Sequence, residues 1–198
     1  MAISDALKAA PNTNVLLLWN HGIVVGANDV EEAGCRLRDF VTRLEITIAP
    51  SVSKEMSDPG ALIRRGEHYL PVDIPNVHAL AREHLLYERV SRNWALYPDH
   101  VVFLGRSAVC YDSRAAFETA LTANQAENLV FVKDHGVLAR RHLTRAQHAQ
   151  LECYVNVIVR VPKEAVLENL VEQQINELLD WEAERYRQRL DDNYDCLF

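Results

Sequence analysis

The sequence predicts an α/β protein, and three observations lead to that class. Short apolar runs alternate with longer amphipathic runs, which is the pattern of strands that alternate with helices. One strand-turn-strand-helix pattern occurs twice, because residues 14–24 match residues 128–138 without a gap. The composition, 48% hydrophobic and 25% charged over 198 residues, is that of a globular protein with one large or two small domains.

The repeated pattern centres on the dipeptide His-Gly, in which the glycine permits a tight turn or the close approach of a bound group. Apolar runs that precede the dipeptides predict buried strands, and the residues after them are expected to return as second strands. The two copies contain the runs 15–19 and 129–132, the dipeptides His21-Gly22 and His135-Gly136, and the returning strands 23–25 and 137–139. Two interpretations stay open: a hairpin turn whose imidazole is held by a backbone carbonyl, or a ligand position.

Apolar residues at spacings of three and four predict the helices. The expected ranges are 2–10, 31–48, 77–94, 113–123, 144–161 and 163–190. Asn28 or Asp29, Ser113 and Thr144 are candidate capping residues, and Pro162 is expected at the first turn of the last helix. These helices and the strands between them give the alternation on which the α/β class depends.

Between the two repeats, the sequence predicts one further hairpin and a domain boundary. The turn 97–100 is followed by the apolar run 101–104, which is expected to pair with residues 108–111. Residues 50–60 are rich in Pro, Ser and Gly, which is typical of a linker. We therefore expect one domain over residues 1–58 and a second over 59–198.

Charge and hydropathy exclude several classes of protein. The net charge is −7, and the Lys and Arg residues are scattered, so we expect no nucleic-acid partner. The longest apolar run, residues 15–19, is far shorter than a membrane span, and residues 1–5 lack the pattern of a secretory signal. Four widely spaced cysteines are typical of reduced thiols. The expected location is the cytoplasm, with no membrane partner.

The other histidines form a pool of candidate ligands, but their spacing favours none of them. His78 and His84 are six residues apart, as are His142 and His148, so neither pair shares a helical face, and all four are expected to be partly exposed surface imidazoles. His100 is expected to line a cleft, or to follow a capping Asp99. The sequence also lacks a phosphate loop, a nucleophile elbow and a dinucleotide fingerprint, so phosphoryl transfer, serine hydrolysis and hydride transfer have no support.

One segment carries a family resemblance. Residues 16–26, Leu-Leu-Leu-Trp-Asn-His-Gly-Ile-Val-Val-Gly, with Asp29-Val-Glu-Glu-Ala33 and Leu44-Glu45 after them, resemble the closing segment of the class II aldolase/adducin family. The resemblance is specific over residues 14–48. Later motifs, including residues 96–105 and the second His-Gly copy, look like the C-terminal part of longer members.

The resemblance implies an α/β/α sandwich around a mixed, largely antiparallel sheet, and a homo-oligomer. Catalytic members hold a divalent metal ion, zinc, with a His-x-His pair and the histidine of Asn-His-Gly, which His21 matches here. The ion acts as a Lewis acid on a hydroxy-carbonyl substrate and stabilises the enediolate left by carbon-carbon cleavage. His135 would be a degenerate second copy of this ligand position, and we favour a structural turn there.

The sequence departs from this pattern because it contains no His-x-His pair, and a catalytic zinc site takes about three protein ligands. The first hypothesis is therefore the C-terminal part of a longer metal-dependent lyase that acts on a sugar phosphate or a similar hydroxy-carbonyl compound. The second is a non-catalytic adducin-like assembly module. The third is an α/β protein in which both His-Gly dipeptides are only hairpin turns.

Overall fold

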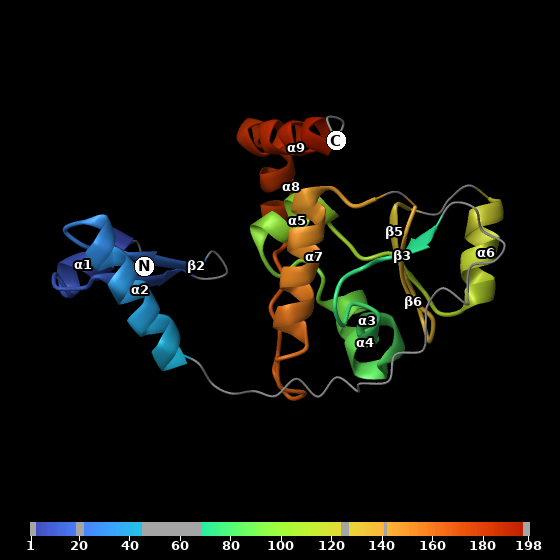
Figure 1. Cartoon of the computed structure of the whole chain (residues 1–198), viewed down its shortest axis with the longest axis horizontal. Coiled ribbons are helices and arrows are strands. Elements are labelled where there is room, and N and C mark those ends of the chain that lie inside the picture. Colours follow the sequence, from blue (N-terminus) through green and yellow to red (C-terminus); the bar gives the residue numbers. More distant parts are fainter. Residues whose placement is uncertain (1–2, 19–21, 45–68, 124–126, 141, 196–198) are drawn as a thin grey trace. The chain divides into compact units, whose positions relative to one another are not determined.

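The computed structural model describes residues 3–18, 22–44, 69–123, 127–140 and 142–195 (Figure 1). The chain divides into two compact units, unit 1 over Met1–Ile48 and unit 2 over Ala49–Phe198. The predicted boundary between residues 58 and 59 lies outside the described residues. Both units combine helices with strands, so the chain is an α/β protein as predicted.

The described residues of unit 1 form one hairpin and two helices. Its elements are α1 (Ile3–Ala9), β1 (Val15–Leu18), β2 (Gly22–Val25) and α2 (Val30–Leu44). The start of α2 is fixed by a reciprocal cap, in which the Glu32 N–H donates to Asp29 Oδ1 at 2.7 Å and the Asn28 N–H donates to Glu32 Oε2 at 3.1 Å. Of the two candidate capping residues, Asp29 therefore accepts the helix N–H.

Unit 2 contains a four-stranded mixed sheet in the order β3-β6-β5-β4. Its strands are β3 (Leu70–Pro71), β4 (Cys110–Tyr111), β5 (Leu129–Val132) and β6 (Gly136–Ala139). Its helices are α3 (Ala79–Arg82), α4 (His84–Arg92), α5 (Pro98–Leu104), α6 (Arg114–Thr122), α7 (Arg145–Ile158), α8 (Glu172–Asp180) and α9 (Glu182–Asp195). β4 runs parallel to β5, and the other two strand pairs are antiparallel.

Helices cover both faces of the unit 2 sheet (Figure 1). Alternate side chains of a strand point to opposite faces, so Phe131 joins one core with residues of α3, α4 and α7. Val130 and Val132 join a second core on the other face with Phe117 of α6. The β5–β6 hairpin is thus buried on both sides.

The internal repeat is confirmed element by element. β1 and β2 lie 114 residues before β5 and β6, and in each copy a helix, α2 or α7, follows the hairpin. The strand registers also agree, since Leu18 pairs with Gly22 and Val132 pairs with Gly136. Both helices are also capped at their start, but one residue apart in the repeat, because Thr144 corresponds to Val30 and accepts the Gln147 N–H at 3.2 Å in a capping box.

The predicted hairpin of residues 101–104 with 108–111 is wrong, because the first run belongs to helix α5. Pro98 occupies the first turn of this helix, where a missing N–H costs nothing, and Gly105, with φ 88°, follows its end. A short apolar run fits a strand and a buried helix equally well. The remaining strand, β4, pairs with β5 instead.

The single helix expected over residues 77–94 is interrupted at Glu83, whose backbone is extended. In a continuous helix the Ala81 carbonyl would accept an N–H four residues later. Here it accepts the Asp134 N–H of the β5–β6 turn at 2.9 Å. A long-range contact therefore ends α3, and α4 begins anew at His84.

The long helix expected over residues 163–190 is also wrong, because its first part is not helical and its second part is divided into α8 and α9 at Trp181, whose backbone is extended. Residues 165–171 are not helical, and Pro162 does not lie in a helix. The Arg89 guanidinium donates to the Val161 carbonyl at 2.8 Å, and the Leu170 N–H donates to the Ala95 carbonyl at 2.7 Å. These contacts with the α4–α5 region hold the chain in a non-helical path until α8 begins.

Candidate functional site

The β5–β6 turn contains the second His-Gly dipeptide and is fastened to α3 through its backbone. Asp134 adopts a left-handed conformation, with φ 61°. Its N–H donates to the Ala81 carbonyl, and Arg82 Nε donates to the His135 carbonyl at 2.8 Å. The backbone of the turn histidine therefore takes part in packing, while its side chain is half-buried.

Gly136 is required by a buried histidine that packs on it. A Cβ at Gly136, where φ is 154°, would lie 2.8 Å from His78 Nδ1. The same nitrogen accepts the Val137 N–H at 3.1 Å, so the ring is a neutral imidazole with its proton on Nε2. Burial, followed by the nearby Arg82 charge, lowers the pKa of His78 and favours that neutral form. His78 is 4% exposed, so the expectation of a surface imidazole is wrong.

The metal implied by the family resemblance does not fit the donors that the structure describes. No group of three His, Cys, Asp or Glu side chains suited to a metal ion occurs in the described ranges. His135 therefore lacks the companions that a catalytic zinc ion needs. His21, the residue that matches the family ligand, lies outside the described residues, as does His68.

His84, His142 and His148 are exposed, as expected of surface imidazoles. His148 Nε2 lies 3.3 Å from the Asp73 carbonyl oxygen, and His84 Nδ1 lies 3.8 Å from a Glu88 carboxylate oxygen. No evident catalytic arrangement includes any of the three.

His100, in α5, is fully buried in an aromatic cage instead of lining a cleft. Its ring centroid lies 4.2 Å from that of Trp94, 4.8 Å from that of Tyr154 and 5.3 Å from that of Tyr97. Within the described structure, neither ring nitrogen has a hydrogen-bond partner. Burial lowers the pKa of His100 to about 3, so the imidazole stays neutral. Asp99, the candidate cap, instead forms an ion pair with Arg187 at 2.9 Å.

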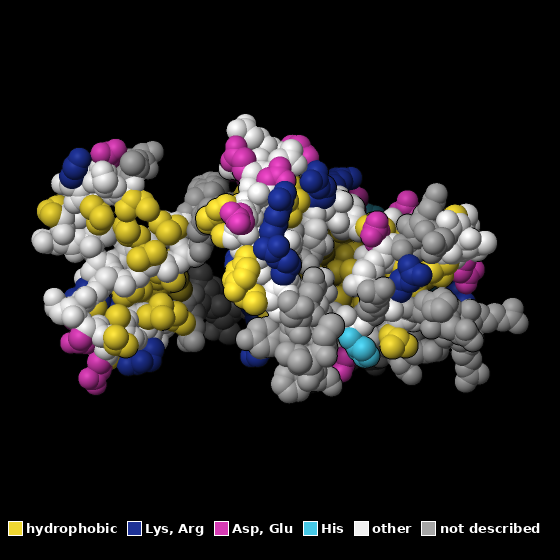
Figure 2. Space-filling view, turned by 90° about the horizontal axis from the view of Figure 1, so that it is seen from above, with side chains coloured by type: hydrophobic (Ala, Val, Ile, Leu, Met, Phe, Trp, Pro, Cys, Tyr) yellow, Lys and Arg dark blue, Asp and Glu magenta, His cyan; other side chains and the backbone are white. Residues whose placement is uncertain are grey.

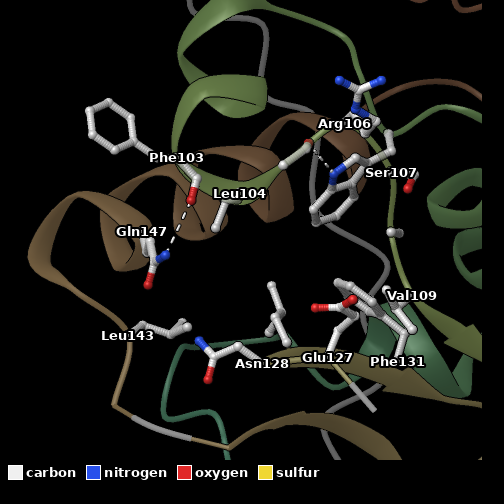
Figure 3. A pocket seen from close by; sticks show the side chains of 14 residues that line it. Phe103, Leu104, Arg106, Ser107, Val109, Glu127, Asn128, Phe131, Leu143 and Gln147 are labelled. Atoms are coloured by element: carbon white, nitrogen blue, oxygen red, sulfur yellow. Dashed lines mark hydrogen bonds between the residues drawn. The ribbon is translucent and has the colours of Figure 1, made fainter. Parts of the chain in front are cut away.

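A cavity of about 310 Å³ lies between the end of α5, strand β5 and the start of α7 (Figure 3). Its apolar walls include Trp94, Phe131 and Leu143, and its polar rim includes Ser107 and Glu127. This volume is at the lower end of the range for small-molecule sites. Sequence reasoning missed the cavity because its walls come from four separate segments.

Several polar groups of the cavity hold its wall together. Trp94 Nε1 donates to the Gly105 carbonyl at 3.0 Å, and Gln147 Nε2 donates to the Phe103 carbonyl at 3.3 Å (Figure 3). Arg106 extends to α8, where it pairs with Glu172 at 2.9 Å. The lining contains the Ser107 hydroxyl and the Glu127 carboxylate, and no hydrogen bond between these two side chains is found among the described residues.

The third candidate site is a set of exposed apolar side chains on the hairpin and on α2 of unit 1. We call the five residues that form it the unit 1 apolar positions: Leu17, Val24, Leu37, Val41 and Leu44. They are between 41% and 70% exposed, and Figure 2 shows apolar side chains gathered over unit 1, at the left. Leu17 pairs with Ile23 and Val24 pairs with Leu16, so Leu17 and Val24 lie on opposite faces of the hairpin. Exposed apolar side chains in such number are typical of interaction sites.

Each unit 1 apolar position corresponds through the repeat to a buried residue of unit 2. The counterparts, in the same order, are Phe131, Leu138, Leu151, Val155 and Ile158. All five counterparts are at most 5% exposed. The repeated strands and helix are therefore buried in complete cores in unit 2, whereas the corresponding apolar side chains are exposed in unit 1.

Comparisons with known proteins returned no matching family model, curated protein or solved structure. The resemblance to the class II aldolase/adducin family thus depends on sequence motifs, specific over residues 14–48 and weaker after them.

Proposed function

We propose that this chain is a class II aldolase/adducin-like protein that acts as a non-catalytic assembly module. The observation that carries the proposal is the exposed state of the unit 1 apolar positions beside the buried state of their counterparts. A half-exposed Leu or Val side chain forfeits about 1 kcal/mol of burial free energy. Five such side chains forfeit an amount comparable to the net stability of a small domain, roughly 5 kcal/mol. Covering these side chains by other polypeptide surfaces would recover that free energy.

The second His-Gly turn supports the same proposal. Its glycine makes room for His78, and its backbone binds Arg82 and Ala81. These contacts explain the dipeptide in unit 2 by packing, without a bound ligand. The donor set around His135 does not fit a catalytic metal ion, so we assign no chemical step to unit 2.

A second candidate function is a metal-dependent lyase that cleaves a carbon-carbon bond in a sugar phosphate or similar hydroxy-carbonyl compound. One observation favours it. Gly22, which follows His21, has φ 110°, and a Cβ built there would meet nothing within 4 Å. In unit 2, His78 fills the space next to Gly136. The corresponding space next to Gly22 is open among the described residues, so another group could approach there. In this alternative, His21 would supply one ligand to zinc, and the other ligands would come from residues that the structure does not describe.

Metal analysis of the purified full chain separates the two functions. The measurement is the zinc content per chain of the wild type, His21→Ala and His135→Ala, with the oligomeric state measured on the same samples. The His135→Ala variant is the matched control, because it changes the same position of the other repeat.

The assembly module predicts an oligomer, no stoichiometric zinc, and no difference between the two variants. About one zinc per chain, lost in His21→Ala and kept in His135→Ala, would overturn it in favour of the lyase. A retro-aldol assay with hydroxy-carbonyl substrates then tests the lyase directly.

A further inference from the structure

We propose that a second copy of this chain docks on the outer edge of β2, so that two unit 1 hairpins form one four-stranded sheet. The strand order is β1-β2-β2′-β1′, where the prime marks the second copy. Helix α2 and its copy then lie on the same face of the joint sheet. This inference rests on the proposed assembly function and names the partner and the edge.

The backbone groups of β2 that face outward follow from its pairing with β1. The Gly26 N–H donates to the Asn14 carbonyl at 2.8 Å, so even-numbered residues of β2 direct their backbone hydrogen-bonding groups toward β1. Ile23 and Val25 therefore direct their N–H and C=O groups to the outer edge. Among the described residues of unit 1, no strand occupies that edge.

Unit 2 shows that the corresponding edge accepts a strand. β6 is the counterpart of β2, and β3 pairs with its outer edge in antiparallel orientation. The Val137 carbonyl, the counterpart of the Ile23 carbonyl, accepts the Val72 N–H there at 3.1 Å. An antiparallel strand is thus the partner that this edge has in the other copy of the repeat.

The orientation of that partner points to a second copy. A two-fold axis between identical strands makes them antiparallel, so β2′ satisfies the edge in the way that β3 satisfies β6. The edge of β1 is different, because its counterpart in unit 2 pairs with the parallel strand β4. A two-fold dimer is therefore compatible with the β2 edge, and the β1 edge would need another kind of strand.

The residues of β2 also favour pairing. Exposed edge strands are commonly protected by charged side chains, by proline or by short length. β3, at the edge of the unit 2 sheet, has two residues, one of which is Pro71. β2 is Gly-Ile-Val-Val, which lacks both proline and charge.

The helices add charge complementarity. α2 has Glu31 and Glu32 in its first turn and Arg43 in its last turn. The two-fold axis that pairs β2 with β2′ makes α2 and α2′ antiparallel. Within its own helix, Glu32 pairs with Arg36 at 2.6 Å and Arg43 pairs with Asp39 at 2.9 Å. The end of each helix that carries Glu31 and Glu32 then faces the end of the other that carries Arg43, and Leu37 and Val41 lie on helices that become neighbours.

The test is the molar mass of the full chain in solution, measured by light scattering during size exclusion. The wild type is expected at twice the 22.5 kDa mass of the chain. Val25→Pro removes an outward N–H and leaves the inward hydrogen bonds to β1, a position at which edge strands tolerate proline. It is expected to give a monomer, and Val41→Lys on α2 is expected to weaken the dimer at least tenfold. Val166→Lys is the matched control, because Val166 is 91% exposed and lies outside both repeats, and it is expected to remain dimeric.

Hydrogen exchange on the same samples keeps the test decisive. The Ile23 and Val25 amides are expected to be protected in the wild type and exposed in Val41→Lys, while protection in α7 stays unchanged and shows that unit 2 is folded. A monomeric wild type overturns the inference. This holds both if hydrogen exchange shows that another part of the chain protects the amides of α2 and if those amides are unprotected. A dimer that survives both Val25→Pro and Val41→Lys also overturns it, yet leaves the assembly function standing. Zinc bound through His21 would instead overturn the assembly function.

Discussion

The two copies of the repeat have the same order of strands and helix, but this pattern is buried in unit 2 and exposed in unit 1. In unit 2, the β5–β6 hairpin has a strand on each edge, and α7 contributes four buried residues to the core. In unit 1, the β1–β2 hairpin forms a two-stranded sheet, and α2 has no buried residue. Local pattern is therefore sufficient for the strands, the turn and the cap, whereas burial depends on which other segments cover the repeat. The predictions below test this difference, from the largest expected effect to the smallest.

The largest difference is expected for the paired leucines Leu151 and Leu37. Leu151 is 0% exposed in the main core, so Leu151→Ala should lower the free energy of unfolding by about 2 to 5 kcal/mol. Leu37→Ala should cost less than about 1 kcal/mol, because Leu37 is 41% exposed. Chemical denaturation, followed by a probe in each unit, measures both values. Equal costs would mean that Leu37 is as well covered as Leu151.

Acid should destabilise unit 2 through His100. The unfolded chain takes up a proton at this imidazole near pH 6.5, whereas burial lowers the pKa in the folded state to about 3. The unfolded state thus binds more protons, and stability falls as the pH decreases from 6.5 toward 3, by about 1.4 kcal/mol per pH unit for this group.

The control is His100→Phe, which keeps an aromatic ring in the cage and removes the titration. Its free energy of unfolding between pH 7 and pH 4 should depend less on pH than that of the wild type. The buried His78 leaves a smaller slope in the same direction. An unchanged slope in His100→Phe would contradict the prediction.

The two repeat glycines should respond differently to alanine. Gly136→Ala forces a Cβ to 2.8 Å from His78 Nδ1 at a positive φ and should cost about 1 to 3 kcal/mol. Gly22→Ala introduces backbone strain alone, since the space above Gly22 is open, and should cost less. A double-mutant cycle of Gly136→Ala with His78→Ala isolates the clash, and additive effects would show that the two residues do not interact.

The smallest expected difference between the units is in the reactivity of their thiols, which is measured without changing stability. Cys35 on α2 is exposed, whereas burial raises the pKa of Cys110 in β4 to about 11. A thiol reagent at neutral pH should therefore label Cys35 quickly and Cys110 only after unit 2 unfolds. Mass spectrometry of the labelled peptides measures both rates, and fast labelling of native Cys110 would contradict its burial.

The predictions from sequence succeeded where the pattern is local and repeated. The strands and helices of both repeats lie where the His-Gly alignment placed them, and Ser113 and Thr144 cap their helices as expected. None of the helices in the described ranges has the length and apolarity that a bilayer crossing needs. The His-Gly dipeptide itself indicated a turn, but its spacing did not reveal that His78, 58 residues earlier, packs on Gly136.

Two of the failed predictions, the helices over 77–94 and 163–190, have a common physical cause, which is competition from distant parts of the chain. The Ala81 carbonyl accepts a hydrogen bond from the turn at Asp134, and this contact divides an expected helix. The backbone around Leu170 binds Ala95, and the expected long helix starts only after it. Periodicity describes which side of a segment is apolar, but it does not specify which partner will take its backbone groups.

The sequence by itself determined the α/β class and the strands of the two repeated hairpins, because each strand depends on a pattern of residues within a few positions of one another. Only the tertiary structure decided that His78 and His100 are buried, that residues 98–104 form a helix, and that one copy of the repeat is covered while the other is exposed. Burial is a property of contacts between segments far apart in the chain, and two nearly identical local patterns therefore reach opposite environments.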